Sequence, residues 1–157
     1  MSDHNMGEPF SGGWAMIGLF VILALATQNP PSANGWTWTL YAAAEPVVLA
    51  HEIPDSASLR TTLECDPGTS VARLTLYGGT AISGMARVVS GEASAVAETS
   101  PGRPGATRLA LRTDHPVFAA FTVDGRMTIV FGDQRRPVEI PPPHLAKLRR
   151  FAELCAG

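Results

Sequence analysis

Charge is scarce in this sequence and unevenly distributed. Charged residues make up 17% of the chain, against about a quarter in typical soluble domains. No lysine or arginine precedes Arg60, and no charged residue of either sign lies between Glu8 and Glu45. Of the 14 acidic residues all but Asp3 and Glu8 follow that gap, so 12 acidic and 12 basic residues balance there. This neutral balance argues against nucleic-acid binding, which requires a strongly basic face.

Sequence motifs for common enzyme chemistry are also missing. The chain has no P-loop and no GxGxxG run, and Ser83 in Ala-Ile-Ser-Gly-Met lacks the first glycine of a nucleophile elbow. No HxH or HxxxH spacing joins His51, His115 and His144, which argues against a metal site. We therefore expect no cofactor, no metal and no enzymatic activity. A small hydrolase is the alternative, and it would need His51 or His115 beside a nucleophile.

The three histidines have simpler structural interpretations. Asp114-His115-Pro116 predicts a turn between two strands, in which Asp114 accepts backbone hydrogen bonds. His51 lies in an alternating segment, where it would pair with a carboxylate or remain a surface strand residue. His144 opens the final helix, and we expect it to be exposed.

The one long apolar run lies near the N-terminus, from Gly12 to Ala26. At about 15 residues, or roughly 22 Å of helix, it is shorter than a usual membrane span and fits the core of a signal peptide. Ala24-Leu25-Ala26 matches a cleavage site, and Ala42-Ala43-Ala44 is a second candidate. The N-terminus, however, lacks the positive charge of a signal peptide.

A retained anchor is the alternative to cleavage. Residues 10–27 are uncharged, with Trp14 towards one end and Trp36 and Trp38 beyond the other, where they could serve as interfacial aromatics. A buried N-terminal helix is a third possibility, although glycine and proline pairs bracket the run as a separate unit. We predict a signal peptide or single transmembrane anchor over residues 1–28 and a linker over 29–35. The protein then belongs to the cell envelope, with its periplasmic domain either membrane-anchored or secreted.

After the linker, apolar and polar residues alternate in short segments separated by turn residues. The alternation predicts strands at Trp36–Tyr41, Val47–Glu52, Leu59–Cys65, Val71–Tyr77, Ala86–Ser90, Ala93–Glu98, Thr107–Thr113, Val117–Val123, Arg126–Phe131 and Pro137–Ile140. Many short strands of this kind are typical of an antiparallel β-sandwich or barrel-like domain. We assign this mainly β fold, with a C-terminal α-helix, to residues 36–157.

Two connections have distinct compositions. Asp124-Gly125 between alternating segments predicts a two-residue type I′ hairpin, which would pair Thr122 with Met127 and Phe118 with Phe131. The run Ser100–Ala106, rich in glycine and proline, predicts a mobile loop.

The two cysteines both fall on core-facing positions. Cys65 shares a strand face with Leu59, Thr61 and Leu63, whereas Arg60, Thr62 and Glu64 point outward. In the final helix, which Pro143 begins, Cys155 continues an apolar stripe formed by Leu145, Leu148 and Phe151 or Ala152. In an exported protein this placement favours a disulfide that clamps the helix to the sheet. Two buried free thiols are the alternative if the domain is cytosolic.

Basic residues cluster towards the C-terminus. The cluster consists of Arg135, Arg136, Lys147, Arg149 and Arg150. It would suit an anionic partner such as lipid headgroups, a glycan or an acidic protein face. The alternative is a solvated helix face beside a polar turn.

Several segments taken together resemble a known group of proteins. The segments are Trp38–Tyr41, Pro46–Asp55, Leu59–Gly68 and Leu148–Cys155. They resemble small, uncharacterised exported β-rich proteins of alphaproteobacteria over roughly residues 36–156. The resemblance implies a small β-rich envelope domain with its cysteines paired, and it carries no catalytic residues.

These observations favour a non-enzymatic interaction or accessory domain of the cell envelope. If residues 10–27 remain in the membrane, the protein would be a single-span accessory subunit of a membrane complex. A soluble periplasmic ligand-binding or inhibitor protein is the first alternative, and a small periplasmic hydrolase is the second. We expect a protein partner in the envelope.

Overall fold

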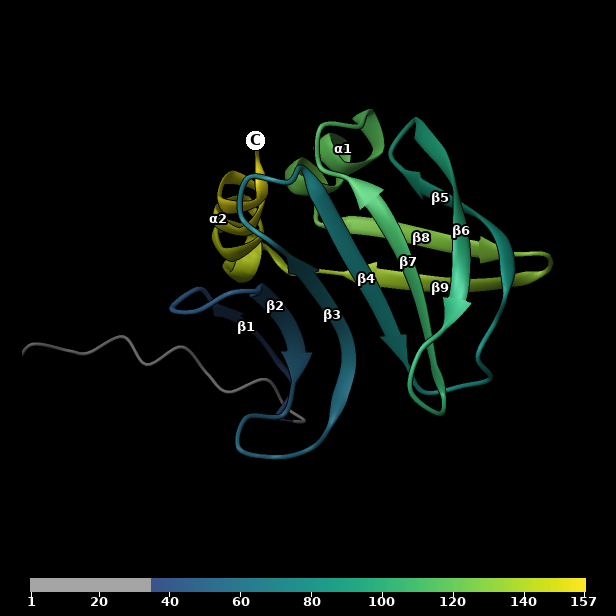
Figure 1. Cartoon of the computed structure of the whole chain (residues 1–157), viewed down its shortest axis with the longest axis horizontal. Coiled ribbons are helices and arrows are strands. Elements are labelled where there is room, and N and C mark those ends of the chain that lie inside the picture. The colour runs from purple at the N-terminus through teal and green to yellow at the C-terminus, as the bar shows by residue number, and fades with distance from the viewer. Residues whose placement is uncertain (1–34) are drawn as a thin grey trace, which may run out of the picture. The chain divides into compact units, whose positions relative to one another are not determined.

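A computed structural model describes residues 35–157 (Figure 1). The predicted signal peptide or anchor, residues 1–28, lies outside the described residues, as does the linker up to residue 34. Nine strands, two α-helices and one 3₁₀ turn follow in this order: β1 (Thr37–Tyr41), β2 (Val47–Glu52), β3 (Leu59–Cys65), β4 (Val71–Tyr77), β5 (Gly84–Ser90), β6 (Ala93–Pro101), β7 (Ala106–Arg112), α1 (Pro116–Asp124), β8 (Arg126–Phe131), β9 (Gln134–Glu139), η1 (Pro142–His144) and α2 (Leu145–Cys155).

All nine strands belong to one antiparallel sheet, in the order β1-β2-β3-β4-β7-β6-β5-β8-β9. The sheet curls, so that β8 and β9 pass behind β4 and β7 in the view of Figure 1. The prediction of a mainly β, antiparallel domain with a C-terminal helix is confirmed. The arrangement is a single half-barrel rather than the two packed sheets of a sandwich. Of the two predicted architectures, the barrel-like one is closer.

The core lies between the inner face of the sheet and the two helices. Leu49, Leu63, Leu74 and Leu109 stand opposite one another on four neighbouring strands and are 4% exposed or less. Helix α1 packs against β5 and β6, and α2 packs against β1 and β2. The fully buried side chains that the helices add are Val117, Phe118, Phe121, Leu148, Phe151 and Cys155.

Residues 116–124 form helix α1, so the strand predicted at Val117–Val123 is wrong. The helix has capping residues at both ends. His115 Nδ1 accepts a hydrogen bond from the Val117 N–H at 3.1 Å, and Pro116 occupies the first turn. At the other end Gly125 adopts a left-handed φ of 68° and donates its N–H to the Phe121 carbonyl at 2.7 Å. Tertiary packing of Phe118 and Phe121 overrides the strand preference of these β-branched and aromatic residues.

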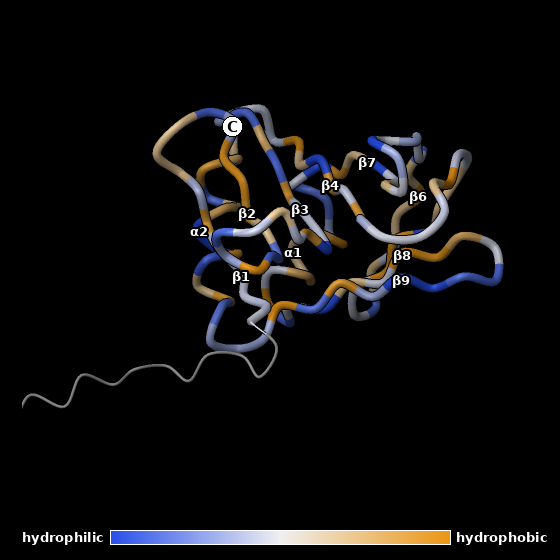
Figure 2. Tube along the Cα trace, turned by 90° about the horizontal axis from the view of Figure 1, so that it is seen from below, coloured by the Kyte–Doolittle hydropathy of each residue, from blue (hydrophilic) through white to orange (hydrophobic). Residues whose placement is uncertain are grey.

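The hairpin predicted at Asp124-Gly125 is therefore also wrong, because this dipeptide ends a helix. Strand β8 begins at Arg126 and pairs with β5 on one side and β9 on the other. The predicted pairings of Thr122 with Met127 and of Phe118 with Phe131 do not occur, since Phe131 stands opposite Gln134. The short strand predicted at Pro137–Ile140 exists as β9, but it begins earlier. Figure 2 shows this last hairpin as an apolar β8 beside a hydrophilic start of β9.

The loop predicted at Ser100–Ala106 is shorter than expected. Strand β6 continues to Pro101 and β7 starts at Ala106, which leaves only residues 102–105 between them. The Gly102 N–H donates to the Ala106 carbonyl at 2.9 Å, and the Ala106 N–H donates to the Arg103 carbonyl at 2.8 Å. These two backbone hydrogen bonds join the ends of the segment and make it a tight turn.

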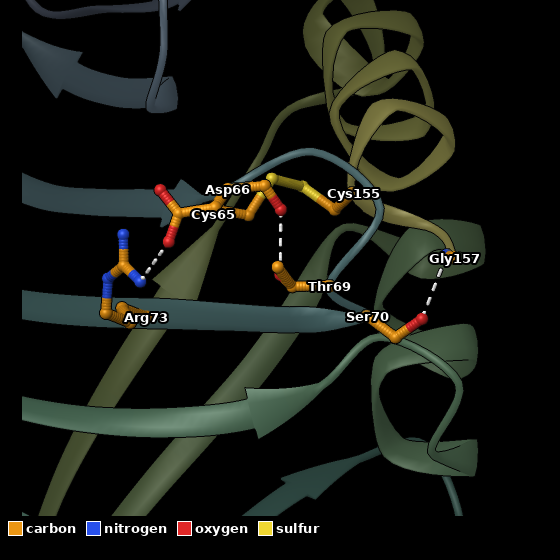
Figure 3. The surroundings of a disulfide bond; sticks show 7 residues. All are labelled: Cys65, Asp66, Thr69, Ser70, Arg73, Cys155 and Gly157. Atoms are coloured by element: carbon orange, nitrogen blue, oxygen red, sulfur yellow. Dashed lines mark hydrogen bonds and ion pairs between the residues drawn. A yellow bond between two sulfur atoms is a disulfide. The ribbon is translucent and has the colours of Figure 1, made fainter.

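The two cysteines are joined, which attaches the end of α2 to the end of β3 (Figure 3). Their Cα atoms lie 5.8 Å apart, and both side chains are fully buried. The Ser70 N–H donates to the Cys155 carbonyl at 2.8 Å, and the Ser70 hydroxyl accepts from the Gly157 N–H at 3.0 Å. Helix α2 is preceded by the turn η1, so it begins at Leu145 rather than Pro143.

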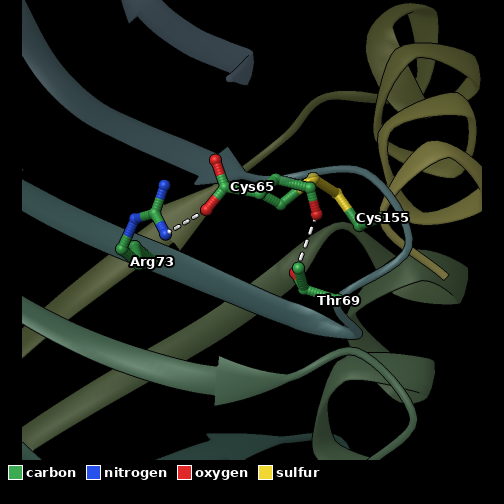
Figure 4. Close-up of polar contacts among 5 residues, drawn as sticks. Cys65, Thr69, Arg73 and Cys155 are labelled. Atoms are coloured by element: carbon green, nitrogen blue, oxygen red, sulfur yellow. Dashed lines mark hydrogen bonds and ion pairs between the residues drawn. A yellow bond between two sulfur atoms is a disulfide. The ribbon is translucent and has the colours of Figure 1, made fainter. Parts of the chain in front are cut away.

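The turn between β3 and β4 is itself held by polar contacts (Figure 4). The Thr69 hydroxyl donates to the Asp66 carbonyl at 2.7 Å, and Arg73 pairs with the Asp66 carboxylate at 2.9 Å. The turn therefore presents Cys65 to α2 in a fixed position. No helix within residues 35–157 is long and apolar enough to cross a membrane.

Candidate functional site

A pocket of 370 Å³ lies where the two ends of the curled sheet approach each other. One side is formed by β1 to β4 and the other by β9. We call it the seam pocket. Its lining residues are Trp38, His51, Arg60, Thr61, Leu76, Tyr77, Arg136, Pro137, Val138 and Glu139.

One row of side chains across β1 to β4 forms one wall of the pocket. The register places Trp38 opposite His51, His51 opposite Thr61 and Thr61 opposite Leu76. Directly opposed residues in an antiparallel sheet carry their side chains on the same face. Trp38, Thr61 and Leu76 are 1%, 6% and 2% exposed, whereas His51 is half-buried and reaches further into the opening.

His51 lies between two indole rings. It stacks on Trp38 with a centroid distance of 4.8 Å and meets Trp36 edge-on at 5.4 Å. Burial lowers the pKa of His51, and the positive charges of Arg60 and His144 lower it further. The pKa of His144 is lowered by its own burial and by Lys147. His51 is therefore a neutral ring at neutral pH, neither a surface residue nor the partner of a carboxylate.

Arg60 reaches the pocket because β3 carries a bulge. Glu52 stands opposite Leu59 and His51 stands opposite Thr61, so Arg60 is an extra residue without a partner on β2. A bulge re-aims side chains relative to simple alternation. Arg60 is exposed, as an outward-pointing residue would be, but it lines the pocket instead of lying on the outer face of the sheet. Its guanidinium lies 4.0 Å from the centre of the Trp36 ring.

Arg136 enters the pocket from the opposite side. It stands opposite Ile129, a fully buried residue, and so shares the inner face of the sheet. Its Nη2 donates to the Tyr77 carbonyl at 2.9 Å, which ties β9 to the end of β4. A Cβ added at Gly79 would lie 3.1 Å from Arg136 Nη1. The guanidinium is therefore held by Tyr77 and lies in space that a side chain at residue 79 would restrict.

The five basic residues predicted as one cluster lie in different surroundings. Arg135 is exposed and, by strand alternation, lies on the outer face, whereas Arg136 faces inward. On α2, Lys147 donates to the Trp38 carbonyl at 2.6 Å and Arg149 donates to the Thr122 carbonyl at 3.4 Å. Arg150 pairs with Glu153 at 3.0 Å. Of the five, only Arg136 lines the seam pocket.

The other predicted site residues have structural roles. The turn predicted at Asp114-His115-Pro116 exists, but it joins β7 to helix α1 rather than to a strand, and the side chain that accepts the backbone hydrogen bond is His115 rather than Asp114. Asp114 instead pairs with Arg112, which lowers the pKa of its carboxyl. Within residues 35–157 no three histidine, cysteine or carboxylate side chains come together as a metal site would require. His144 is half-buried rather than exposed.

Comparison of the chain with protein-family models, with curated proteins and with solved structures gave no match.

Proposed function

We propose that this chain is a non-enzymatic binding domain of the cell envelope that acts through the seam pocket. The pocket is the observation that carries the proposal. Its volume of 370 Å³ falls within the usual range of small-molecule sites, roughly 300–1,000 Å³. It joins the Trp38 and His51 rings to two positioned arginines, so that ring surface and charged hydrogen-bond donors face one opening.

The envelope location is supported by the disulfide and by the predicted N-terminal segment. Cys65 and Cys155 are fully buried and joined over a separation of 90 residues. Disulfides of this structural kind persist in oxidising compartments and are rare in the cytosol. The resemblance to exported alphaproteobacterial proteins points to the same compartment.

Two forms of the protein remain candidates within this proposal. With residues 10–27 retained, it is a single-span accessory subunit that contacts a protein partner in the envelope. With those residues cleaved, it is a soluble periplasmic binding or inhibitor protein. The pocket serves the anchored form and the form cleaved after Ala26, because its described lining begins at Trp38.

The intact mass of the native protein in membrane and soluble envelope fractions tests this proposal. A species that starts at Thr27 in the soluble fraction identifies a periplasmic binding protein, whereas one that starts at Glu45 would lack Trp38 and would contradict the seam pocket as its binding site. A full-length species in the membrane fraction identifies an anchored subunit. Either species should incorporate thiol-alkylating reagent only after reduction. Full-length protein in the cytosol, alkylated without reduction, would contradict the envelope proposal.

A hydrolase remains the competing function because Thr61 stands opposite His51 in the same pocket. Catalysis would require His51 to accept the proton of the Thr61 hydroxyl. No hydrogen bond joins these two side chains within the described part of the chain, and the ring of His51 is engaged by Trp36 and Trp38. Ester hydrolysis that is lost in Thr61→Ala but kept in Thr69→Ala would favour the hydrolase.

A further inference from the structure

Arg60 and Arg136, the two arginines of the seam pocket, are held by neutral groups and form no ion pair with a carboxylate among the described residues. The ion pairs within residues 35–157 involve Arg73, Arg112 and Arg150. Arg60 instead lies on the Trp36 ring, and Arg136 donates to a backbone carbonyl. An aromatic face and a carbonyl fix a guanidinium in place while leaving its full positive charge. The seam pocket therefore holds two fixed cations at its walls.

The remaining groups around the opening do little to offset this charge. Glu139 is the only carboxylate in the pocket lining, against Arg60 and Arg136. Lys147 adds a further positive charge close by, since its ammonium donates to the Trp38 carbonyl. His51 stays neutral and contributes a ring surface. The local balance is positive although the chain as a whole carries a formal charge of −2.

The lining combines polar residues with some accessible carbon surface. Thr61 and Tyr77 are polar, and Leu76 and Val138 are only 2% exposed. The carbon surface open to a ligand therefore belongs mainly to the half-buried His51 ring and to exposed Pro137. A free inorganic ion would leave this surface unused, whereas an organic body would cover it. Guanidinium groups bind carboxylate and phosphate oxygens through paired hydrogen bonds.

We propose that the seam pocket binds a small organic oxyanion, with its carboxylate or phosphate group between Arg60 and Arg136 and its apolar body against the His51 ring and Pro137. This inference rests on the proposed binding function and names the class of ligand. Arg60 and Arg136 are then binding residues, and Trp36 and Tyr77 position them.

Calorimetric titration of the full chain at constant ionic strength tests the inference. The probes are benzoate and phenyl phosphate, with benzyl alcohol and benzylamine as the uncharged and cationic comparators. We expect saturable one-to-one binding of at least one anion, and the stronger of the two identifies the oxyanion. Benzyl alcohol and benzylamine should bind at least about 10-fold more weakly, because each lacks the charge-assisted hydrogen bonds.

Arg136→Gln and Arg60→Gln should each weaken anion binding about 10-fold or more. Arg135→Gln is the matched control, because it removes the same charge from the neighbouring position on the outer face and should leave affinity unchanged. Arg136→Lys keeps the charge but loses the planar fork, so its affinity should be intermediate. Circular dichroism and the thermal midpoint establish that each variant is folded.

Three outcomes would overturn the inference: no saturable binding of either anion, equal or tighter binding of a comparator, or an equal loss in Arg135→Gln. Tight binding of benzyl alcohol or benzylamine would support the proposed binding function but contradict an oxyanion as the ligand. Absence of binding by all four probes would contradict the proposal that the seam pocket binds small molecules. The envelope location is tested separately, by the mass measurement.

Discussion

At the scale of single residues, the surroundings of His51 favour its neutral ring. The ring lies against Trp36 and Trp38, with Arg60 and His144 nearby. Burial is the main reason for its lowered pKa, and repulsion from Arg60 and from His144 acts in the same direction. Protonation of His51 would place a second positive charge beside Arg60. The pocket is therefore stable with His51 neutral.

This arrangement predicts that the domain loses stability as pH falls. The folded-state pKa values of His51 and His144 lie below their usual 6.5, so the unfolded chain binds protons more tightly. The two histidines contribute their full share to the free energy of unfolding above about pH 6.5. This share is lost as the pH falls towards their folded-state pKa values. Urea unfolding between pH 7.5 and pH 4.5 should show this decline. Asp114, whose lowered pKa starts from 3.8, acts in a lower pH range.

The variant His51→Gln should flatten the pH dependence, because one of the two depressed histidines is gone. The comparison is between slopes, since the loss of ring stacking also lowers the stability of the variant at every pH. A slope equal to that of the wild-type protein would contradict the assignment to His51.

At the scale of elements, the sequence predicts strands well and the one short apolar helix badly. The bounds of β2, β3, β4 and β8 agree with the predicted ranges. Every second residue of β8 is buried, whereas β3 and β4 each bury three consecutive residues and are bounded in the sequence by turn residues. Residues 116–124 are apolar nearly all round, so no period distinguishes a helix from a strand. The capping residues His115 and Gly125 were the available indication of a helix.

The site was less predictable than the fold for a physical reason. The seam pocket depends on the strand register and on one bulge. The bulge turns Arg60 toward the same pocket as Thr61, and the register places Arg136 within reach of the Tyr77 carbonyl. Neither a register nor a bulge leaves a periodic pattern in the sequence. The basic cluster did include Arg136, but proximity along the chain grouped it with residues on other faces.

Gly125 joins three elements, and its replacement should be costly. It has a left-handed φ of 68°, and an added Cβ would overlap the Ile140 carbonyl and lie 2.7 Å from Leu145 Cδ2. Gly125→Ala should therefore lower the free energy of unfolding by about 3 kcal/mol, through backbone strain and overpacking. Denaturant unfolding measures the loss.

Gly132→Ala is the matched control for this prediction. Gly132 also has a positive φ, of 54°, but nothing lies within 4 Å of its added Cβ. It should lose only the backbone contribution, about 1 kcal/mol. Equal losses in the two variants would show that the contacts of Gly125 with Ile140 and Leu145 do not matter.

At the scale of the whole molecule, the half-barrel is held together by side chains where its strands do not pair. The edge strands are β1 and β9, and the Trp38 indole N–H donates to the Glu139 carbonyl at 3.0 Å between them. Arg136 ties β9 to β4, and Lys147 ties α2 to β1. The seam pocket exists because these contacts close the sheet without filling the gap.

The disulfide acts on the same scale, because it attaches the last helix to the sheet. The link spans 90 residues, and the chain-entropy account gives a stabilisation of about 4–5 kcal/mol for a loop of that size. Reduction, or the double variant Cys65→Ser with Cys155→Ser, should lower the free energy of unfolding by about that amount. Coincident denaturation midpoints of the oxidised and reduced protein would contradict this role.

The central claim is that the seam pocket is the binding site. Two-dimensional ¹H–¹⁵N NMR of the full chain, during titration with whichever of benzoate and phenyl phosphate binds more tightly, tests it most directly. We expect the Trp38 indole signal and the amides of His51, Thr61 and Tyr77 to shift together, with one saturating dissociation constant. Signals that stay fixed in the pocket, or shifts centred on Arg135 and Arg150, would contradict the claim.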